Sequence, residues 1–174
     1  RREALGRERL EDQEHALTGY ALARLARVPG LRLLGPLAGR DRVGVLTFVL
    51  PPLSHEQVAA ALAYEHGISV RSGCFCAHPA MFDLLALDEE AVAGARARLR
   101  RHDRADVPGA VRASLGLQST RAEVDRLATA LTELAERGPR ASYERGPDGE
   151  PRPVGWKDEL PANLRRLLRS TNAA

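Results

Sequence analysis

The sequence ISVRSGCFCAHP, residues 68–79, predicts a short β-strand that ends in a loop of small residues. Its β-branched start favours a strand over residues 68–71, and the glycine that follows favours a turn. The loop carries both cysteines of the chain, Cys74 and Cys76, beside His78. Loops held on a rigid strand end often carry reactive side chains, so we expect the chemistry of this protein here.

Cys76 has the surroundings of an activated thiol, because Arg71 and His78 lie close in sequence and nearby cations stabilise a thiolate. A buried structural cysteine in an ordinary turn is an open alternative, since free cysteine is among the most buried residue types. The alternation of Cys74, Cys76 and His78 also raises metal binding, although a structural zinc site needs four ligands and usually a wider cysteine spacing. A disulfide between the two cysteines would close a very small, strained ring.

The composition is that of a globular protein. The 174 residues are 44% hydrophobic and 28% charged, and a chain of this length buries roughly 70% of its unfolded surface. The closely spaced cysteines argue against a secreted disulfide framework and fit a reducing cytoplasm, where we expect the protein. The longest apolar run, residues 43–50, is far shorter than a membrane span, and the charged start lacks the apolar core of a signal peptide. We therefore expect no membrane association.

Arginine supplies almost all of the positive charge. Lys157 is the only lysine among 26 lysines and arginines, and the net charge is +3. Arginine stays protonated and forms no Schiff base, so Lys157 is the only candidate for an imine in this sequence. The basic run over residues 96–104 lacks interleaved aromatic residues and suits a solvated helix face, so we expect no nucleic-acid partner.

Periodicity and capping residues predict a mixture of helices and strands. An amphipathic helix is predicted over residues 7–28, and capped helices begin after Ser54 and Thr120. Asp88 is a further capping residue, inside a helical insertion over residues 80–108. The predicted strands are residues 31–34, 43–50, 68–71 and 109–115.

This order of elements predicts an α+β fold, with a small, mostly antiparallel sheet covered by helices. Residues 1–28 form the leading helix and residues 29–137 the small domain that contains the insertion. Residues 138–174 are expected to form an irregular strap rich in proline and glycine, followed by a short terminal helix. Trp156 is expected to bury its ring and so to fix the strap to the body.

Two sequence blocks occur in the order of a known family. They are RSGCFCAHP at residues 71–79 and VRASLGLQST at residues 111–120, the latter followed by EVDRL at residues 123–127. They resemble the cysteine loop and the C-terminal signature of the class V pyridoxal-phosphate enzymes, in the cysteine desulfurase and selenocysteine lyase branch. The resemblance covers about residues 8–137. It implies the small C-terminal domain of a fold-type I enzyme, which is a short sheet packed with helices.

The resemblance also implies roles for individual residues. Cys76 matches the thiol that attacks the sulfur of a substrate cysteine, which gives a persulfide and alanine. Arg112 matches the arginine that holds the substrate carboxylate, for which a planar guanidinium is well suited, and Arg71 is a second substrate-binding candidate. Cys74 has no matching role; it either accepts sulfur or packs, and packing is favoured. His78 either assists deprotonation or is a hydrogen-bonded structural histidine.

The resemblance implies a full-length parent that is a homodimer, uses pyridoxal phosphate on a cysteine-like amino acid and passes sulfur to an acceptor protein. The imine lysine of the family lies in a large domain that would precede residue 1, so we expect this chain to be a fragment that is inactive alone. Two alternatives stay open. The parent is an aminotransferase or epimerase in which Cys76 is incidental, or the chain is a stand-alone thiol or binding module without a cofactor.

Residues 1–174 mixed with pyridoxal phosphate are expected to form no stable imine, because Lys157 belongs to no motif that matches the family. The absorbance should remain that of free cofactor, and a Lys157→Arg variant should give the same spectrum. A borohydride-fixed adduct on Lys157 would overturn this expectation.

Overall fold

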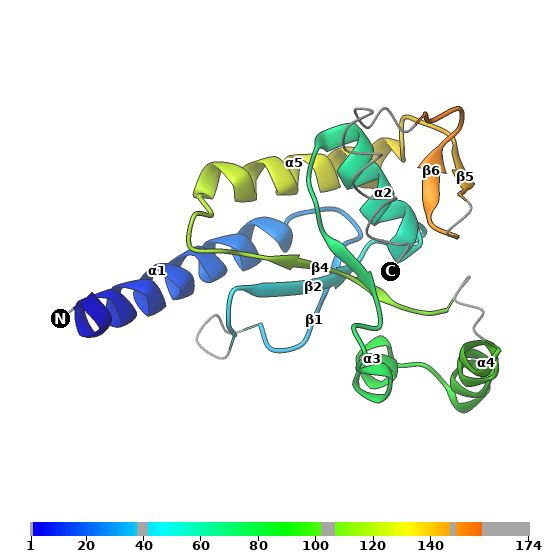
Figure 1. Cartoon of the computed structure of the whole chain (residues 1–174), viewed down its shortest axis with the longest axis horizontal. Coiled ribbons are helices and arrows are strands. Elements are labelled where there is room, and N and C mark those ends of the chain that lie inside the picture. Colours follow the sequence, from blue (N-terminus) through cyan, green and yellow to red (C-terminus); the bar gives the residue numbers. More distant parts are fainter. Residues whose placement is uncertain (1, 38–41, 102–106, 147–148, 158–174) are drawn as a thin grey trace, which may run out of the picture.

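The computed structural model describes residues 2–37, 42–101, 107–146 and 149–157, and its centre is a four-stranded antiparallel sheet in the order β1-β2-β4-β3. The strands are β1 (Arg32–Leu34), β2 (Val45–Val49), β3 (Arg71–Gly73) and β4 (Ala110–Ser114). The helices are α1 (Arg2–Leu25), α2 (His55–His66), α3 (His78–Leu85), α4 (Glu89–Arg100) and α5 (Arg121–Arg137). Helices α1, α2 and α5 lie on one side of the sheet, and α3 and α4 lie on the other (Figure 1). The predicted α+β class is confirmed.

The sheet separates two apolar clusters. The main core joins the three helices α1, α2 and α5 to the inward side chains of β2 and β4, which are Leu46, Phe48, Val111 and Ala113. A smaller cluster lies on the opposite face, around α3 and α4, and includes Leu34 and Ala110 of the sheet. Successive side chains of a strand point to opposite faces, so Arg112, between Val111 and Ala113, lies on the face of the smaller cluster.

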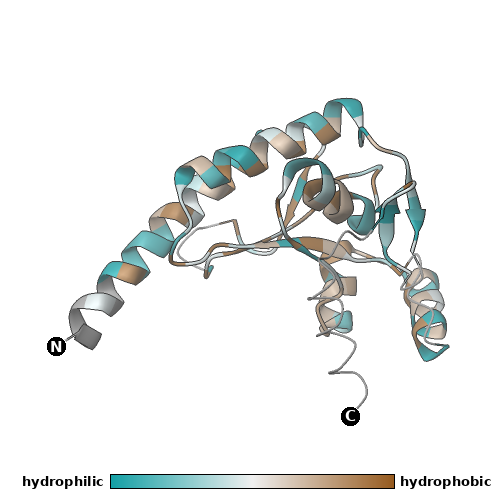
Figure 2. Cartoon of the chain, turned by 45° about the horizontal axis from the view of Figure 1, so that its top comes forward, coloured by the Kyte–Doolittle hydropathy of each residue, from teal (hydrophilic) through white to brown (hydrophobic). Residues whose placement is uncertain are grey.

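The N-terminal end of α1 extends beyond the sheet (Figures 1 and 2). Hydrophilic positions are frequent on this outer part of α1, whereas hydrophobic positions gather where the helices meet the sheet (Figure 2). The apolar face of α1 that packs on the core belongs to its second half, with Leu17, Ala21 and Leu25. The hydrophobic effect therefore fixes the C-terminal half of this helix to the sheet. None of the described helices combines the length and the apolarity of a membrane span.

The predicted helix caps are confirmed. Gln57 N–H donates to Ser54 Oγ at 3.1 Å, and Ser54 N–H donates to Gln57 Oε1 at 3.0 Å, which is a complete capping box. Thr120 and Glu123 form the same arrangement at the start of α5, and the side chain of Asp88 caps α4. A cap of this kind contributes about 1 kcal/mol. These local bonds fix where the three helices begin.

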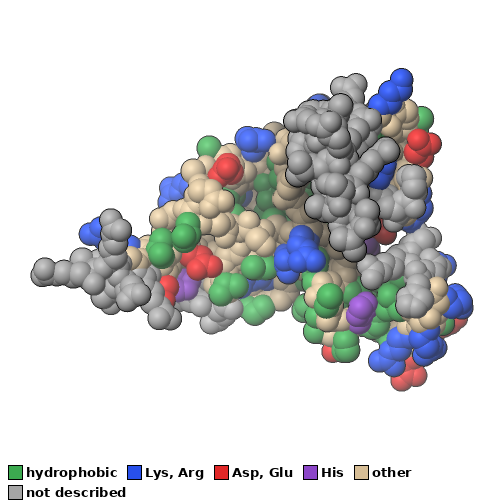
Figure 3. Space-filling model, in the orientation of Figure 1, with side chains coloured by type: hydrophobic (Ala, Val, Ile, Leu, Met, Phe, Trp, Pro, Cys, Tyr) green, Lys and Arg blue, Asp and Glu red, His purple; other side chains and the backbone are tan. Residues whose placement is uncertain are grey.

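Most of the described residues in the insertion over residues 80–108 belong to the helices α3 and α4. Helix α4 is acidic in its first turn and basic in its last turn. The helix dipole stabilises charges in this order, because its N-terminal end is positive and its C-terminal end is negative. Its inner face, with Ala95, belongs to the smaller cluster. Basic side chains gather on its outer surface (Figure 3).

The strand predicted over residues 68–71 is wrong in its position. Ile68 N–H donates to Leu62 O at 2.8 Å, and this bond completes the end of α2. The residues directly after α2 therefore form the end of that helix and not a strand. Pairing with β4 begins only at Arg71. The consequence is a short strand, β3, that starts at the arginine of the cysteine motif.

The segment after residue 138 is more regular than predicted. Strands β5 (Tyr143–Arg145) and β6 (Pro151–Pro153) form an antiparallel hairpin. Trp156 is 53% exposed, so the expectation of a buried side chain is wrong. Its contact with the body is an edge-to-face one with Tyr64 of α2, with 4.8 Å between the ring centroids. The predicted terminal helix falls in residues 158–174, outside the described residues.

Glu65 of α2 fastens this hairpin. Its carboxylate accepts hydrogen bonds from Arg140 N–H at 3.0 Å, Ala141 N–H at 3.2 Å and Tyr143 O–H at 2.8 Å. Burial acts to raise the pKa of Glu65, but the three donors outweigh it and hold the pKa below its usual value. Burial and the bond to Glu65 raise the pKa of Tyr143.

Docking of the hairpin should weaken in acid. The folded-state pKa of Glu65 lies below its unfolded value, so its contribution to stability is complete above the unfolded pKa of about 4.3 and is lost as the pH falls through the folded pKa. Fluorescence of Trp156, the only tryptophan, reports the docking. We expect the emission spectrum to change below about pH 4. Glu65→Gln should show the altered spectrum already at neutral pH, whereas the exposed Glu136→Gln should behave as the unmodified protein. An acid transition that persists in Glu65→Gln would exclude this role.

Candidate functional site

The cysteine loop is a tight turn with an unusual backbone. Ala77 N–H donates to Cys74 O at 2.8 Å, and the two residues between them, Phe75 and Cys76, have φ angles of 53° and 60°. Two left-handed residues inside such a hydrogen bond are typical of a type I′ turn, which usually contains asparagine and glycine. Other residues adopt it at a cost that persists only where surrounding contacts hold it, and such backbone strain is concentrated at functional sites.

The two cysteines of this turn have different environments, and both are free. Cys74 is 8% exposed, and its thiol donates to Pro108 O at 3.0 Å. Burial raises the pKa of Cys74, which favours the neutral thiol. Cys76 is exposed. Cys74 therefore packs as a small hydrophobic residue, and Cys76 is the thiol that a reactant can reach.

A pocket of about 250 Å³ opens beside the turn. Four residues singled out from the sequence line it together, namely Arg71, Cys74, Cys76 and His78. The rest of its wall includes the start of α2, Leu99 of α4, Val107 before β4 and Glu150 of the hairpin. Arg71 comes from β3 and His78 from the start of α3, so the turn between these two elements is what brings the thiol to the pocket.

Arg112 is not part of that wall. It lies directly opposite Arg71 in the pairing of β4 with β3, so the two side chains lie on the same face of the sheet. Its guanidinium carbon lies 5.0 Å from the centroid of the Phe75 ring. Its Nε is buried and has no hydrogen-bond partner among the described residues. A buried donor without a partner is costly, so this geometry favours an acceptor, such as an anionic ligand, at Arg112.

His78 has a structural contact as well as a place in the pocket. Its ring packs edge-to-face on Phe82, with 6.0 Å between the centroids. It is the first residue of α3, where Pro79 follows it. The contact with Phe82 agrees with a packed histidine, and its position on the pocket wall keeps an accessory role open to test.

His55 is a pocket residue that the sequence analysis missed. Its Nε2 lies 3.0 Å from Val107 O, and its Nδ1 is buried without a hydrogen-bond partner in the described part of the chain. Gly109 lies so close that a Cβ atom there would be 2.7 Å from His55 Nε2 and 2.8 Å from Gly73 Cα. Only glycine fits this contact, which holds the start of β4 against the cysteine loop. The glycine at the first position of the strand predicted over residues 109–115 was the available signal.

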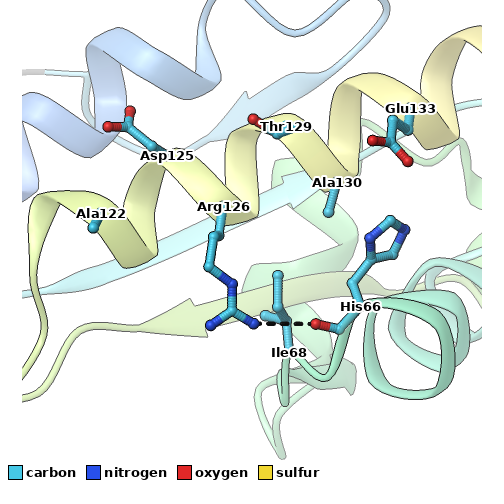
Figure 4. A pocket seen from close by; sticks show the side chains of 8 residues that line it. All are labelled: His66, Ile68, Ala122, Asp125, Arg126, Thr129, Ala130 and Glu133. Atoms are coloured by element: carbon cyan, nitrogen blue, oxygen red, sulfur yellow. Dashed lines mark hydrogen bonds between the residues drawn. The ribbon is translucent and has the colours of Figure 1, made fainter.

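A second groove lies between α5 and the end of α2 (Figure 4). Arg126, on its wall, donates to His66 O at 3.2 Å. Asp125 accepts a hydrogen bond from Tyr20 O–H at 2.7 Å and pairs with Arg24 at 2.6 Å. These charged groups are bound within the chain, and the residues of the cysteine motif lie elsewhere. The pocket beside the turn is therefore the candidate site.

In the described part of the chain, no cluster of three or more histidine, cysteine or acidic side chains is placed to hold a metal ion.

The chain is similar to known cysteine desulfurases in sequence and in structure. The aminotransferase class-V family model matches residues 2–127. A probable cysteine desulfurase of Streptomyces coelicolor is 34% identical over 131 residues, which are 75% of this chain and 26% of that protein. A cysteine desulfurase of Escherichia coli O127:H6 is 35% identical over 131 residues, with the same two shares. The chain thus spans about a quarter of the length of these two curated relatives.

Solved structures of similar fold include two cysteine desulfurases. The apo structure of the enzyme from Thermococcus onnurineus NA1 is 29% identical, with a TM-score of 0.60, over 77% of this chain and 28% of that chain. An Escherichia coli cysteine desulfurase in an S-sulfonic acid form is 27% identical, with a TM-score of 0.51, over 73% of this chain and 25% of that chain.

Iodoacetamide at neutral pH should alkylate Cys76 much faster than Cys74. Cys76 is exposed, whereas Cys74 is buried, donates to Pro108 and has a raised pKa. Peptide mass spectrometry after brief labelling should find one modified residue, Cys76, and Cys74→Ser should leave its labelling rate unchanged. Equal labelling of the two cysteines would contradict the geometry of the turn.

Proposed function

Because the chain belongs to the aminotransferase class-V family, we propose that it supplies the thiol and the carboxylate-binding arginines of a cysteine desulfurase. The cysteine desulfurases among its relatives support this reaction over others of the family. The substrate is a cysteine-like amino acid. The chain corresponds to about a quarter of those relatives, so the complete active site includes further polypeptide.

In the proposed reaction the thiolate of Cys76 attacks the substrate sulfur and forms an S–S bond. The C–S bond of the substrate breaks, and the carbon that loses sulfur takes up a proton. Cysteine and the enzyme thiol become alanine and the Cys76 persulfide, so the reaction needs no external oxidant or reductant. This chemistry requires an accessible thiolate on a positioned loop, and the exposure of Cys76 beside its pocket supports the assignment.

The observation that carries the proposal is the pairing of Arg71 with Arg112 on the sheet face next to the cysteine turn. A substrate carboxylate would supply the acceptor that Arg112 Nε lacks among the described residues. We assign Arg112 to hold this carboxylate and Arg71 to assist from the pocket wall. His78 and Cys74 are candidate accessory residues. Cys74 is the weaker of the two, because it is buried.

The residues of this chain do not by themselves fit pyridoxal phosphate. Lys157, the only lysine, is exposed beyond the hairpin and does not line the pocket of Cys76. We propose that the remaining polypeptide of the enzyme holds this cofactor, that residues 1–174 are inactive alone and that the complete enzyme is a homodimer. The Cys76 persulfide would then pass its outer sulfur to a thiol of an acceptor protein.

L-cysteine added to the complete enzyme should place a persulfide on Cys76, which mass spectrometry after alkylation detects. Cys76→Ser should abolish both the persulfide and alanine formation, whereas the matched Cys74→Ser should retain them. Arg112→Lys keeps the charge but loses the planar fork, so kcat/KM should fall about tenfold or more.

Undiminished turnover of the amino acid by Cys76→Ser would reject desulfuration. That result would favour transamination or epimerisation, in which the thiol has no part.

A further inference from the structure

Phe75 connects the thiol turn to the carboxylate-binding arginine. It precedes Cys76 directly, and its ring lies under the guanidinium of Arg112, with 5.0 Å between the guanidinium carbon and the ring centroid. The ring also packs against the smaller apolar cluster around α3 and α4. Phe75 thus contacts the strand that bears the arginine while its own backbone belongs to the turn that bears the thiol.

The backbone of this turn needs support. Phe75 and Cys76 both have left-handed φ angles, which residues other than glycine, asparagine and aspartate rarely adopt. The hydrogen bond from Ala77 N–H to Cys74 O closes the turn but does not by itself select this backbone form. A contact that anchors the Phe75 side chain to the sheet would favour the left-handed form over relaxed alternatives.

Arg112 gains from the same contact. Its Nε is buried and unpaired among the described residues, so its positive charge lacks part of its normal solvation. The negative face of an aromatic ring attracts a guanidinium, and this attraction is strongest where water is excluded. The ring of Phe75 therefore compensates in part for the lost solvation of the guanidinium. It also restricts the orientation of this group.

We propose that Phe75 is a positioning residue that locks the Cys76 turn to Arg112. The inference rests on the proposed function for its purpose, because a carboxylate held by Arg112 would then lie in a fixed relation to the thiol. If Phe75 only filled space in the apolar cluster, the state of the turn would not depend on Arg112. The two interpretations therefore differ in a measurable coupling between positions 75 and 112.

Hydrogen exchange of the Ala77 amide, followed by NMR on residues 1–174, measures how often the turn opens. Phe75→Leu keeps an apolar side chain without an aromatic face, and Arg112→Gln removes the charge. Each should speed the exchange of Ala77 about fivefold, and the double variant should exchange no faster than either single variant. Phe75→Trp, which restores an aromatic face, should return the rate to that of the unmodified protein.

The matched control is Arg71→Gln, which removes the arginine opposite Arg112. Its effect on Ala77 should add to that of Phe75→Leu. The amide of Ile68, bonded to Leu62 O, is the internal reference and should be unchanged in every variant that keeps the fold. Additive effects of Phe75→Leu and Arg112→Gln, or failure of tryptophan to restore protection, would refute the lock. The exchange experiment requires neither cofactor nor turnover, so absence of a Cys76 persulfide would reject the proposed function and leave this coupling result standing.

Discussion

The pairing of β3 with β4 is the interaction on which the candidate site depends. It sets Arg71 against Arg112 and Gly73 against Ala110, residues that are far apart in sequence. Backbone hydrogen bonds between the strands fix the register, and the register decides that both arginines share a face. Shifting the edge strand β3 by one residue would turn the side chain of Arg71 to the opposite face of the sheet, away from Arg112. The thiol turn starts directly after Gly73, the last residue of β3, so its position follows from the same pairing.

Much of the fold could be predicted because its signals are local. Two capping boxes indicate where helices begin, because each joins residues that are only three positions apart: Ser54 with Gln57, and Thr120 with Glu123. Apolar periodicity identifies the helix faces that meet the sheet. The motif around Cys76 indicated where the exposed thiol lies. The parts that could not be predicted depend on contacts distant in sequence. The carboxylate of Glu65 holds the hairpin by accepting hydrogen bonds from residues 140–143. No local sequence pattern indicates that this carboxylate, and not a buried Trp156, attaches the segment to the body.

The position of Arg112 illustrates the same limit. Its strand was predicted, but its partner was not, because the contact with Phe75 depends on a left-handed backbone that the sequence does not favour at that residue. The close approach of Gly109 to His55 and Gly73 is another such contact. Tertiary packing overrides local preference at these points, and both lie beside the thiol. Local rules therefore fail beside the candidate site, as they do at the hairpin held by Glu65.

The connection between β3 and β4 runs through α3 and α4, yet it begins and ends on neighbouring strands. Closing a flexible loop becomes only slightly more costly with length, by about 0.6 kcal/mol for each doubling. Since the sheet register holds the two ends together, the helical part of this connection that follows the thiol turn can change in length while Arg71 and Arg112 keep their spacing. The outer surface of α3 and α4 can thus change while the paired strands beside the candidate site stay the same.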